Sequence, residues 1–296
     1  MRTRSGFQRS AFLSFLAVIA LLDGPVHAQG TPPDAADRKK VQADFLAALN
    51  DLRKAAGVPS VALDAELSKT CQSHAEYCVR NWKAHEERGK YLNMQQKDLP
   101  GYDAKVASAA LYCAVDAQLP MQTLESRLAD ATSRHYLLAP DLKKVGLGWA
   151  KGGRNGTISV VDFASGRKPG SFPPVIWPPD KRTDVPLDWV RDALGLLPQD
   201  PDQRGGYALS AHFPDKAAVE GASAKLSDGA GKDVDVWVVS LETAPDEIRR
   251  NRTMGNDILV IAKDPLAPAT TYSVTVKAKV SGKAWSRTWT FTTVSK

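Results

Sequence analysis

The chain has 296 residues, a formal net charge of +6 and a hydrophobic share of 43%. This length predicts about two domains, and the hydrophobic share is sufficient for packed cores. The excess positive charge is small and spread along the chain, which excludes the dense basic face of a nucleic-acid-binding protein.

The first 28 residues carry the three parts of a secretory signal peptide. Their start is basic, an apolar run extends from Ala11 to Leu22, and small residues precede a cut after Ala28. The apolar run is too short to span a bilayer, which needs about 20 residues, and no later stretch is longer. We therefore expect cleavage near Ala28 and a secreted or periplasmic protein without a transmembrane segment. An uncleaved membrane anchor is the alternative.

The next part of the chain has a helical pattern. A first helix is predicted from Asp37 and a second from Asp64, which can cap it. The small apolar run 106–115 fits either a strand or a helix, because periodicity does not separate the two. A third helix is predicted to begin at Pro120 and to carry His135 on its apolar face.

Strand patterns dominate the remainder. Residues 145–150 and 157–163 are two predicted strands joined by a glycine-rich turn. The Pro-rich stretch 168–179 is either an inter-domain linker or a first edge strand. Short strands separated by turn signals then suggest an all-β sandwich; they are predicted at 207–213, 223–226, 234–241, 257–262, 271–280 and 284–293.

Export permits disulfides, so the three cysteines are disulfide candidates. Cys71 and Cys78 lie seven residues apart on the second predicted helix. This spacing separates them by about 10.5 Å along the helix, too far for a bond between them. Cys113 could pair with either. The alternative is three reduced cysteines in the core.

His74 and His85 belong to the second predicted helix and its end. His74 lies on the inner stripe between two cysteines, where a core or wall histidine is the expected role. His85 is followed by Glu86 and Glu87, which could supply an acid or a base. A solvated charged turn is the alternative interpretation of this acidic pair.

The remaining histidines of the exported chain are His135 and His212. His135 and His85 come from separate elements and could bind zinc if they converge with a third ligand. His212 lies in a predicted strand, where we expect a structural role. The sequence contains no nucleophile elbow, His-Glu-x-x-His helix, phosphate-binding loop or paired-cysteine zinc motif.

Residues 38–163 resemble the CAP superfamily of cysteine-rich secretory, antigen 5 and pathogenesis-related proteins, and in particular its bacterial SCP-like branch. The resemblance depends on the order and spacing of several short pieces. These are Asn50-Asp-Leu-Arg53 followed by Gly57, Asp64-x-x-Leu67 followed by His74-Ala75, His85, Ser133-Arg-His135, Val145-Gly-Leu-Gly-Trp-Ala150 and Val160-Val-Asp-Phe163.

The resemblance implies a fold and a site. The fold is an α-β-α sandwich, with helices on both faces of an antiparallel sheet. The site is an open cavity bearing His85 and His135, with His74 beside it, and in many members two acidic residues complete a divalent metal site. Here the segment 106–113 has no acid, and Asp130 stands where a substitute for the second acid is possible.

Residues 172–296 resemble a bacterial Ig-like module. The resemblance is carried by Pro178–Pro186, Leu266–Val276 and Trp289–Thr293. Such modules usually space, display or adhere, and seldom catalyse.

The fold class predicted from these observations is α+β, a CAP-like α-β-α sandwich followed by an all-β Ig-like sandwich. The predicted organisation is a signal peptide (1–28), a lead-in (29–37), a CAP/SCP-like domain (38–166), a Pro-rich linker (167–180) and an Ig-like domain (181–296).

The predicted function is that of an exported, non-enzymatic binding protein without a cofactor. Its expected partners are an extracellular or envelope protein, or a glycan or lipid ligand, and not nucleic acid. One alternative is a zinc-dependent hydrolase centred on His85 and His135, and another is a lipid or sterol carrier.

Overall fold

The computed structural model describes residues 35–189, 205–244, 246 and 256–295. The predicted signal peptide and most of the predicted lead-in lie outside the described residues. Within the described ranges, no helix is both long and apolar enough to cross a membrane.

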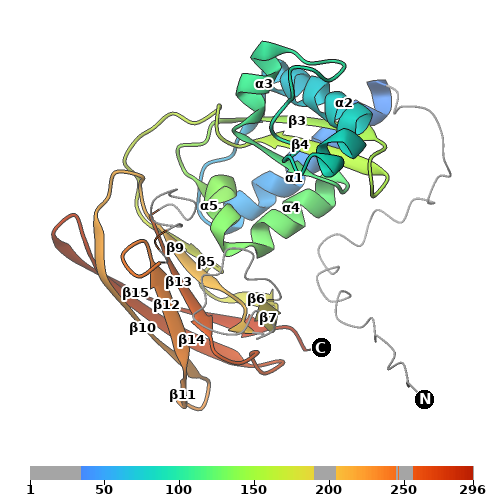
Figure 1. The fold of residues 1–296 in the computed structure, drawn as a ribbon. Helices are drawn as coiled ribbons and strands as arrows, with labels where there is room; N and C mark the ends of the chain where they lie inside the picture. Colours follow the sequence, from blue (N-terminus) through green and yellow to red (C-terminus); the bar gives the residue numbers. More distant parts are fainter. Residues whose placement is uncertain (1–34, 190–204, 245, 247–255, 296) are drawn as a thin grey trace, which may run out of the picture.

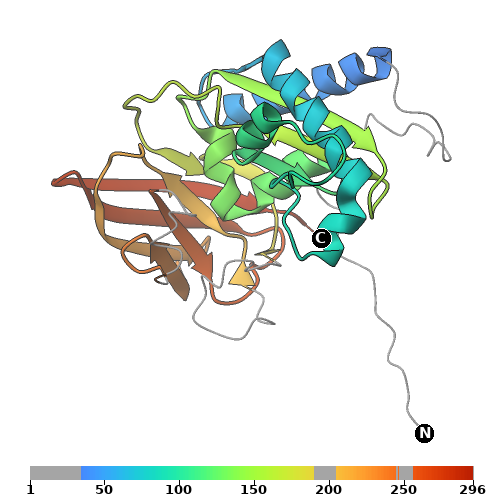
Figure 2. The ribbon, with the colours of Figure 1, turned by 45° about the horizontal axis from the view of Figure 1, so that its top comes forward.

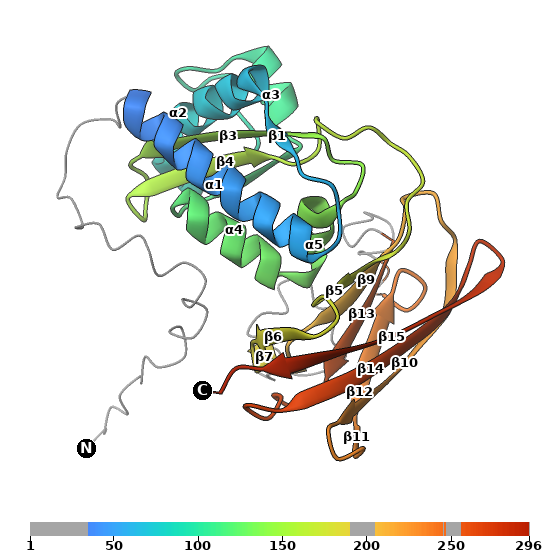
Figure 3. The same ribbon diagram turned by 180° about the vertical axis from the view of Figure 1, so that it is seen from behind.

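The first part of the molecule, which we call the helical half (residues 35–163), places helices on both faces of a four-stranded sheet. The sheet order is β1-β3-β4-β2, with β1 parallel to β3 and the other pairs antiparallel. Helices α2 and α3 cover one face, and α1, α4 and α5 lie on the other (Figures 1 and 3). The elements are α1 (Ala35–Ala55), β1 (Ala62–Leu63), α2 (Ala65–Glu87), α3 (Ala104–Ala110), β2 (Cys113–Asp116), α4 (Pro120–Ala129), α5 (Ala131–Leu138), β3 (Lys144–Lys151) and β4 (Thr157–Asp162).

Helix α2 packs directly on β3. Asp64 caps the helix as predicted, because its Oδ1 accepts the backbone N–H groups of Glu66 and Leu67, each at 3.0 Å. Gly148 on β3 allows the close contact, since a Cβ atom there would lie 2.1 Å from the backbone nitrogen of Gln72. The glycines of the Val-Gly-Leu-Gly-Trp segment therefore fix the distance between the helix and the sheet.

Two predicted elements of the helical half are each divided in the structure. The expected third helix breaks at Asp130, whose backbone is extended and whose side chain caps α5 by accepting the N–H of Thr132 at 3.0 Å. The run 106–115, left open between strand and helix, contains both, because α3 ends at Ala110 and β2 begins at Cys113.

The second part, which we call the β half (residues 175–293), is built mainly from strands in its described residues. One sheet has the order β11-β10-β14-β15-β6, a second has the order β12-β13-β9-β5, and β7 and β8 form a separate two-stranded ribbon. The strands are β5 (Val175–Trp177), β6 (Arg182–Val185), β7 (Asp188–Trp189), β8 (Gly205–Gly206), β9 (Leu209–His212), β10 (Val219–Asp228), β11 (Asp233–Val234), β12 (Val236–Ser240), β13 (Asp257–Ala262), β14 (Thr271–Val280) and β15 (Lys283–Thr293).

The alternation read from the sequence sets the inner faces of these sheets. Tyr272, Val274 and Val276 of β14 are buried, as are Trp289 and Phe291 of β15. Their side chains share a core with the buried residues of β13 and β9. Within the Pro-rich stretch, residues 175–177 form the edge strand β5, which pairs with β9.

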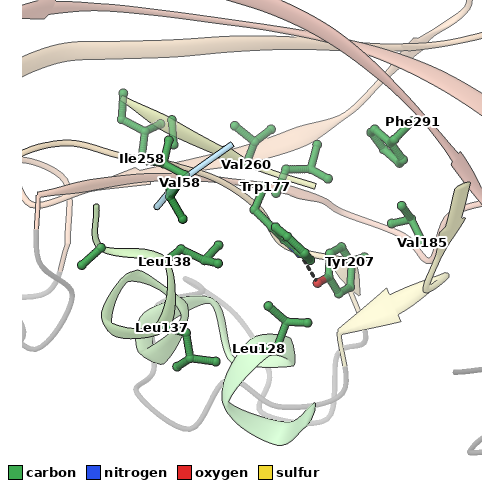
Figure 4. Packing of buried hydrophobic residues seen from close by; sticks show 14 of the residues in the cluster. Val58, Leu128, Leu137, Leu138, Trp177, Val185, Tyr207, Ile258, Val260 and Phe291 are labelled. Atoms are coloured by element: carbon green, nitrogen blue, oxygen red, sulfur yellow. Dashed lines mark hydrogen bonds between the residues drawn. The ribbon is translucent and has the colours of Figure 1, made fainter. Parts of the chain in front are cut away.

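The two halves lie side by side and share one hydrophobic core (Figure 2). Figure 4 shows Leu128 and Leu138 of the helical half facing the β half, where Trp177, Tyr207 and Val260 lie. The indole of Trp177 donates to the Tyr207 hydroxyl at 3.0 Å, which satisfies its buried N–H. The halves are thus joined by a packed interface rather than by the connecting chain alone.

Candidate functional site

His85 lies at the end of α2 and is enclosed by protein partners. Its side chain is buried, its Nε2 is 3.0 Å from the Tyr77 hydroxyl, and its Nδ1 is 3.1 Å from the backbone oxygen of Tyr91. Tyr77 Oη in turn accepts the N–H of Gln96 at 2.8 Å. Both ring nitrogens of His85 are therefore engaged, and a ligand would have to break one of these contacts.

His74 lies on the same face of α2, three residues before Tyr77. Its ring is buried, and its two nitrogens lie 3.1 Å from Gln95 Nε2 and 3.5 Å from Cys78 Sγ. Burial, with a smaller contribution from the neighbouring His85, lowers the pKa of His74 to about 4. His74 is therefore neutral at pH 7, as expected of a histidine built into a core.

His135 lies in a different place. It extends from α5 toward the β half, and its Nδ1 atom is 3.3 Å from Oδ2 of Asp257 on β13. Its ring centre is 6.3 Å from that of His212 on β9. The contacts of His135 and those of His85 have no residue in common among the described residues, so the structure does not place the two histidines in one site.

Arg134, the residue before His135, is also buried and binds both halves. Its guanidinium donates to the backbone oxygens of Leu128 and Ala129 in the helical half, at 2.7 and 3.3 Å. It also donates to the backbone oxygen of Ala208 at 2.8 Å and to the hydroxyls of Ser210 and Tyr207 at 3.0 and 3.1 Å. We call Arg134, His135, Ser210, His212 and Asp257 the junction network.

Three members of the junction network have the order of a catalytic relay. Ser210 Oγ lies 3.2 Å from His212 Nε2, and His212 Nδ1 lies 2.9 Å from Asp257 Oδ1. In hydrolases this order activates a serine hydroxyl for attack on a carbonyl carbon. Here all three side chains are buried, the Ser210 hydroxyl also accepts from Arg134, and the adjoining cavity has a volume of only about 10 Å³. The relay geometry therefore lacks room for a substrate.

The charge of Asp257 is compensated from both sides. Burial acts to raise the pKa of the Asp257 carboxyl, but the facing His212 and His135 outweigh it and hold this pKa below its usual value. Asp257 could not be predicted as a site residue from the sequence, because an acid at the start of an apolar strand does not reveal which helix packs against it. The assignment of His212 to a strand gave no sign of its partner either.

The residues of the helical half do not fit the metal site that the CAP resemblance implies. Among the described residues, no group of three or more His, Cys, Asp or Glu side chains is placed to hold a metal ion. Asp130, the possible substitute acid, is occupied as the N-cap of α5, and its Oδ2 accepts the Ser133 hydroxyl at 2.6 Å. Glu86 forms an exposed ion pair with Arg154 at 3.2 Å, so it is solvated, but it lies within α2 and not in a turn.

The three cysteines are free and buried, so the structure does not support the predicted disulfide. Cys71, Cys78 and Cys113 pack in one cluster between α2 and the sheet, together with Ile158 and Val160. Burial raises the pKa of the Cys78 thiol to about 12, which keeps it in its unreactive form. The alternative of three reduced core cysteines is the arrangement observed.

Sixteen chains of solved structures match, two of which are described here, and no curated protein matches. An outer surface protein from Borrelia burgdorferi is 15% identical, with a TM-score of 0.31, and the match covers 45% of this chain and 96% of that protein. A DUF4426 family protein from Pseudomonas aeruginosa PAO1 is 18% identical, with a TM-score of 0.20, over 30% of this chain and 74% of the other. Neither similarity carries a functional argument.

A family model does match the helical half. It is that of the cysteine-rich secretory protein family, CAP, and it covers residues 46–163, from within α1 to the residue after β4. This range contains the α2 histidines and the Arg134-His135 pair. The match supports the assignment of residues 46–163 to a CAP domain.

Proposed function

We propose that the protein is an exported, non-enzymatic binding protein, in which a CAP domain and an Ig-like β half act as one body. The observation that carries this proposal is the commitment of the two expected cavity histidines to separate structural roles. His85 is enclosed by Tyr77 and Tyr91, and His135 is paired with Asp257. Both ring nitrogens of His85 are engaged, and His135 faces Asp257 rather than His85.

The junction supports the same proposal. Buried Arg134 donates to Ala208 and Ser210 of the β half, and the two halves share one core. A large apolar interface holds domains in a fixed orientation, which suits presentation of a binding surface. The partner proposed is an extracellular or envelope protein, since nothing in the described histidine sites favours zinc chemistry over binding.

The proposal is tested by assaying the mature chain against ester, peptide and glycan substrates, beside a His85→Ala/His135→Ala double variant. We expect the wild type and the variant to give the same background rate. Hydrolysis by the wild type that the double variant loses would contradict the proposal, provided that circular dichroism shows the variant to be folded. His212→Ala serves as a second variant, because it tests the buried relay separately.

A further inference from the structure

Strand β3 has an edge that no strand covers along its second part. β1 pairs only with its beginning, at Lys144 and Val145, after which the chain turns at Asp64 into α2. On its other side β3 pairs with β4 over residues 146–151. The edge at Leu147 and Trp149 therefore faces away from β4 without a partner strand among the described residues.

Side chains occupy the hydrogen-bonding groups of this edge. Gln42 Nε2 donates to the Leu147 oxygen at 2.8 Å, and the Leu147 N–H donates to Ser68 Oγ at 3.2 Å. The Trp149 N–H donates to Gln72 Oε1, and Gln72 Nε2 donates to the Trp149 oxygen, each at 3.1 Å. Three side chains thus reproduce the hydrogen-bond pattern that a neighbouring strand would supply.

A groove of about 380 Å³ lies over the same side chains. Its size falls within the range of about 300 to 1,000 Å³ that is typical of ligand sites. We call it the edge groove, and it is lined by Arg38, Gln42, Leu63, Ala65, Ser68, Lys69 and Gln72. It continues the line of β1 beyond the point where β1 ends.

The charge of the edge groove is positive. Its lining contains Arg38 and Lys69 and no carboxylate. Arg38 has an acidic neighbour outside the lining, since its guanidinium lies 3.7 Å from Glu76. Lys69 is exposed and forms no ion pair within the described part of the chain. A ligand carboxylate would therefore find its complement at Lys69.

Capping side chains at a sheet edge can serve only to prevent aggregation. Such protection needs no open volume, because a covering helix or loop achieves it more completely. Here Gln42 and Ser68 are each attached to the edge by one hydrogen bond and Gln72 by two, and the space beside the caps is open. An incoming backbone can take over these bonds while the half-buried amides of Gln42 and Gln72 turn to water.

We propose that the edge groove binds an extended peptide segment of a partner protein, which adds a strand to β3 at Leu147 and Trp149 and places a carboxylate beside Lys69. This inference rests on the proposed binding function and names its partner class. Main-chain hydrogen bonds to β3 supply affinity, and the lysine selects acidic segments.

The test is a selection of random heptapeptides displayed on phage, carried out on the wild-type mature chain and on Ala65→Trp. Ala65 is exposed, so the indole fills the groove without disturbing the core, and an unchanged melting temperature checks this. We expect acidic peptides to be enriched on the wild type and not on Ala65→Trp. Failure to enrich any peptide beyond the Ala65→Trp background overturns the proposal.

The enriched peptide is then synthesised and its affinity measured by fluorescence anisotropy. We expect Lys69→Glu to weaken binding by at least about tenfold, and the charge-matched Lys277→Glu on β14 to leave it unchanged. N-methylation of alternate peptide bonds should abolish binding, because it removes the donors that a strand offers. The proposal is overturned if the peptide still binds after N-methylation, or if Lys69→Glu leaves its affinity unchanged.

These outcomes are separable from failure of the proposed function. A hydrolytic activity lost in the His85→Ala/His135→Ala variant would contradict the non-enzymatic function without involving the edge groove. Absence of peptide enrichment would overturn the peptide-binding proposal for the edge groove without contradicting the non-enzymatic function.

Discussion

His135 of α5 lies 3.3 Å from Asp257 of β13, through its Nδ1 atom and the carboxylate Oδ2. The histidine that the CAP resemblance assigns to a cavity is therefore part of the junction between the two halves. Asp257 also holds His212 at 2.9 Å through its other oxygen, so a single buried carboxylate faces two imidazoles from different elements.

Asp257→Asn should lower the free energy of unfolding by about 2 kcal/mol, because the neutral amide removes the buried negative charge that faces both imidazoles. Urea unfolding monitored by tryptophan fluorescence measures the change. Asp233→Asn is the control, since Asp233 pairs with Lys225 in an exposed position, and its effect should stay within about 0.5 kcal/mol. Equal effects of the two substitutions on the free energy of unfolding would contradict a stabilising role of the buried Asp257 carboxylate.

Arg134→Met should have a larger effect than Asp257→Asn. The substitution leaves the oxygens of Leu128, Ala208 and Ser210 without their buried donor, and we expect a loss of about 3 to 5 kcal/mol. Because Arg134 joins the halves, the variant should also unfold in two calorimetric transitions where the wild type shows one. Arg154→Met removes an exposed pair with Glu86 and is the matched control. A single unshifted transition for Arg134→Met would refute the role of this residue.

Gly148→Ala should prevent stable folding of the helical half, or cost at least about 3 kcal/mol. The added methyl would lie 2.1 Å from the Gln72 nitrogen and 2.3 Å from the Cys71 carbonyl carbon, both backbone atoms of a fixed helix. Gly170→Ala is the control, because the nearest atom to its Cβ would be 3.8 Å away. Thermal unfolding followed by circular dichroism compares the two, and similar melting temperatures would contradict the tight contact between α2 and β3.

Stability should fall as the pH is lowered from 6.5 toward 4, because burial lowers the pKa of His74 from 6.5 to about 4. In this window the unfolded chain binds a proton at His74 that the folded chain does not bind. The loss from this residue is at most about 3 kcal/mol. His74→Gln should reduce the difference in unfolding free energy between pH 7 and pH 4.5. It should not abolish the difference, since burial also lowers the pKa of His212. An unchanged pH dependence in His74→Gln would assign the effect to other groups.

Much of the fold could be predicted from local sequence signals. Asp64 gave the start of α2 because a carboxylate before an apolar stripe is a strong cap. The alternation in residues 271–280 gave the buried face of β14, because side chains in a strand alternate between its two faces. Asp130 was harder to interpret, since no glycine or proline marks the break between α4 and α5 and the break depends on capping of Thr132.

The site was less predictable because it depends on contacts between distant segments. The sequence predicted helical positions for His74 and His135 and placed His85 just after a helix, but it could not show what each ring faces. His85 is enclosed by the loop that follows its own helix, through Tyr91. His135 meets Asp257, which is 122 residues later in the chain by the difference of their numbers. The edge groove could not be predicted from the sequence either, since it arises where the two-residue strand β1 leaves the longer β3 uncovered.

Zinc titration calorimetry tests whether His85 and His135 serve separate structural purposes. The wild-type mature chain at neutral pH should give the same zinc isotherm as His85→Asn and His135→Asn, with no stoichiometric site that depends on both residues. A one-to-one zinc site in the wild type that either substitution removes would contradict the account.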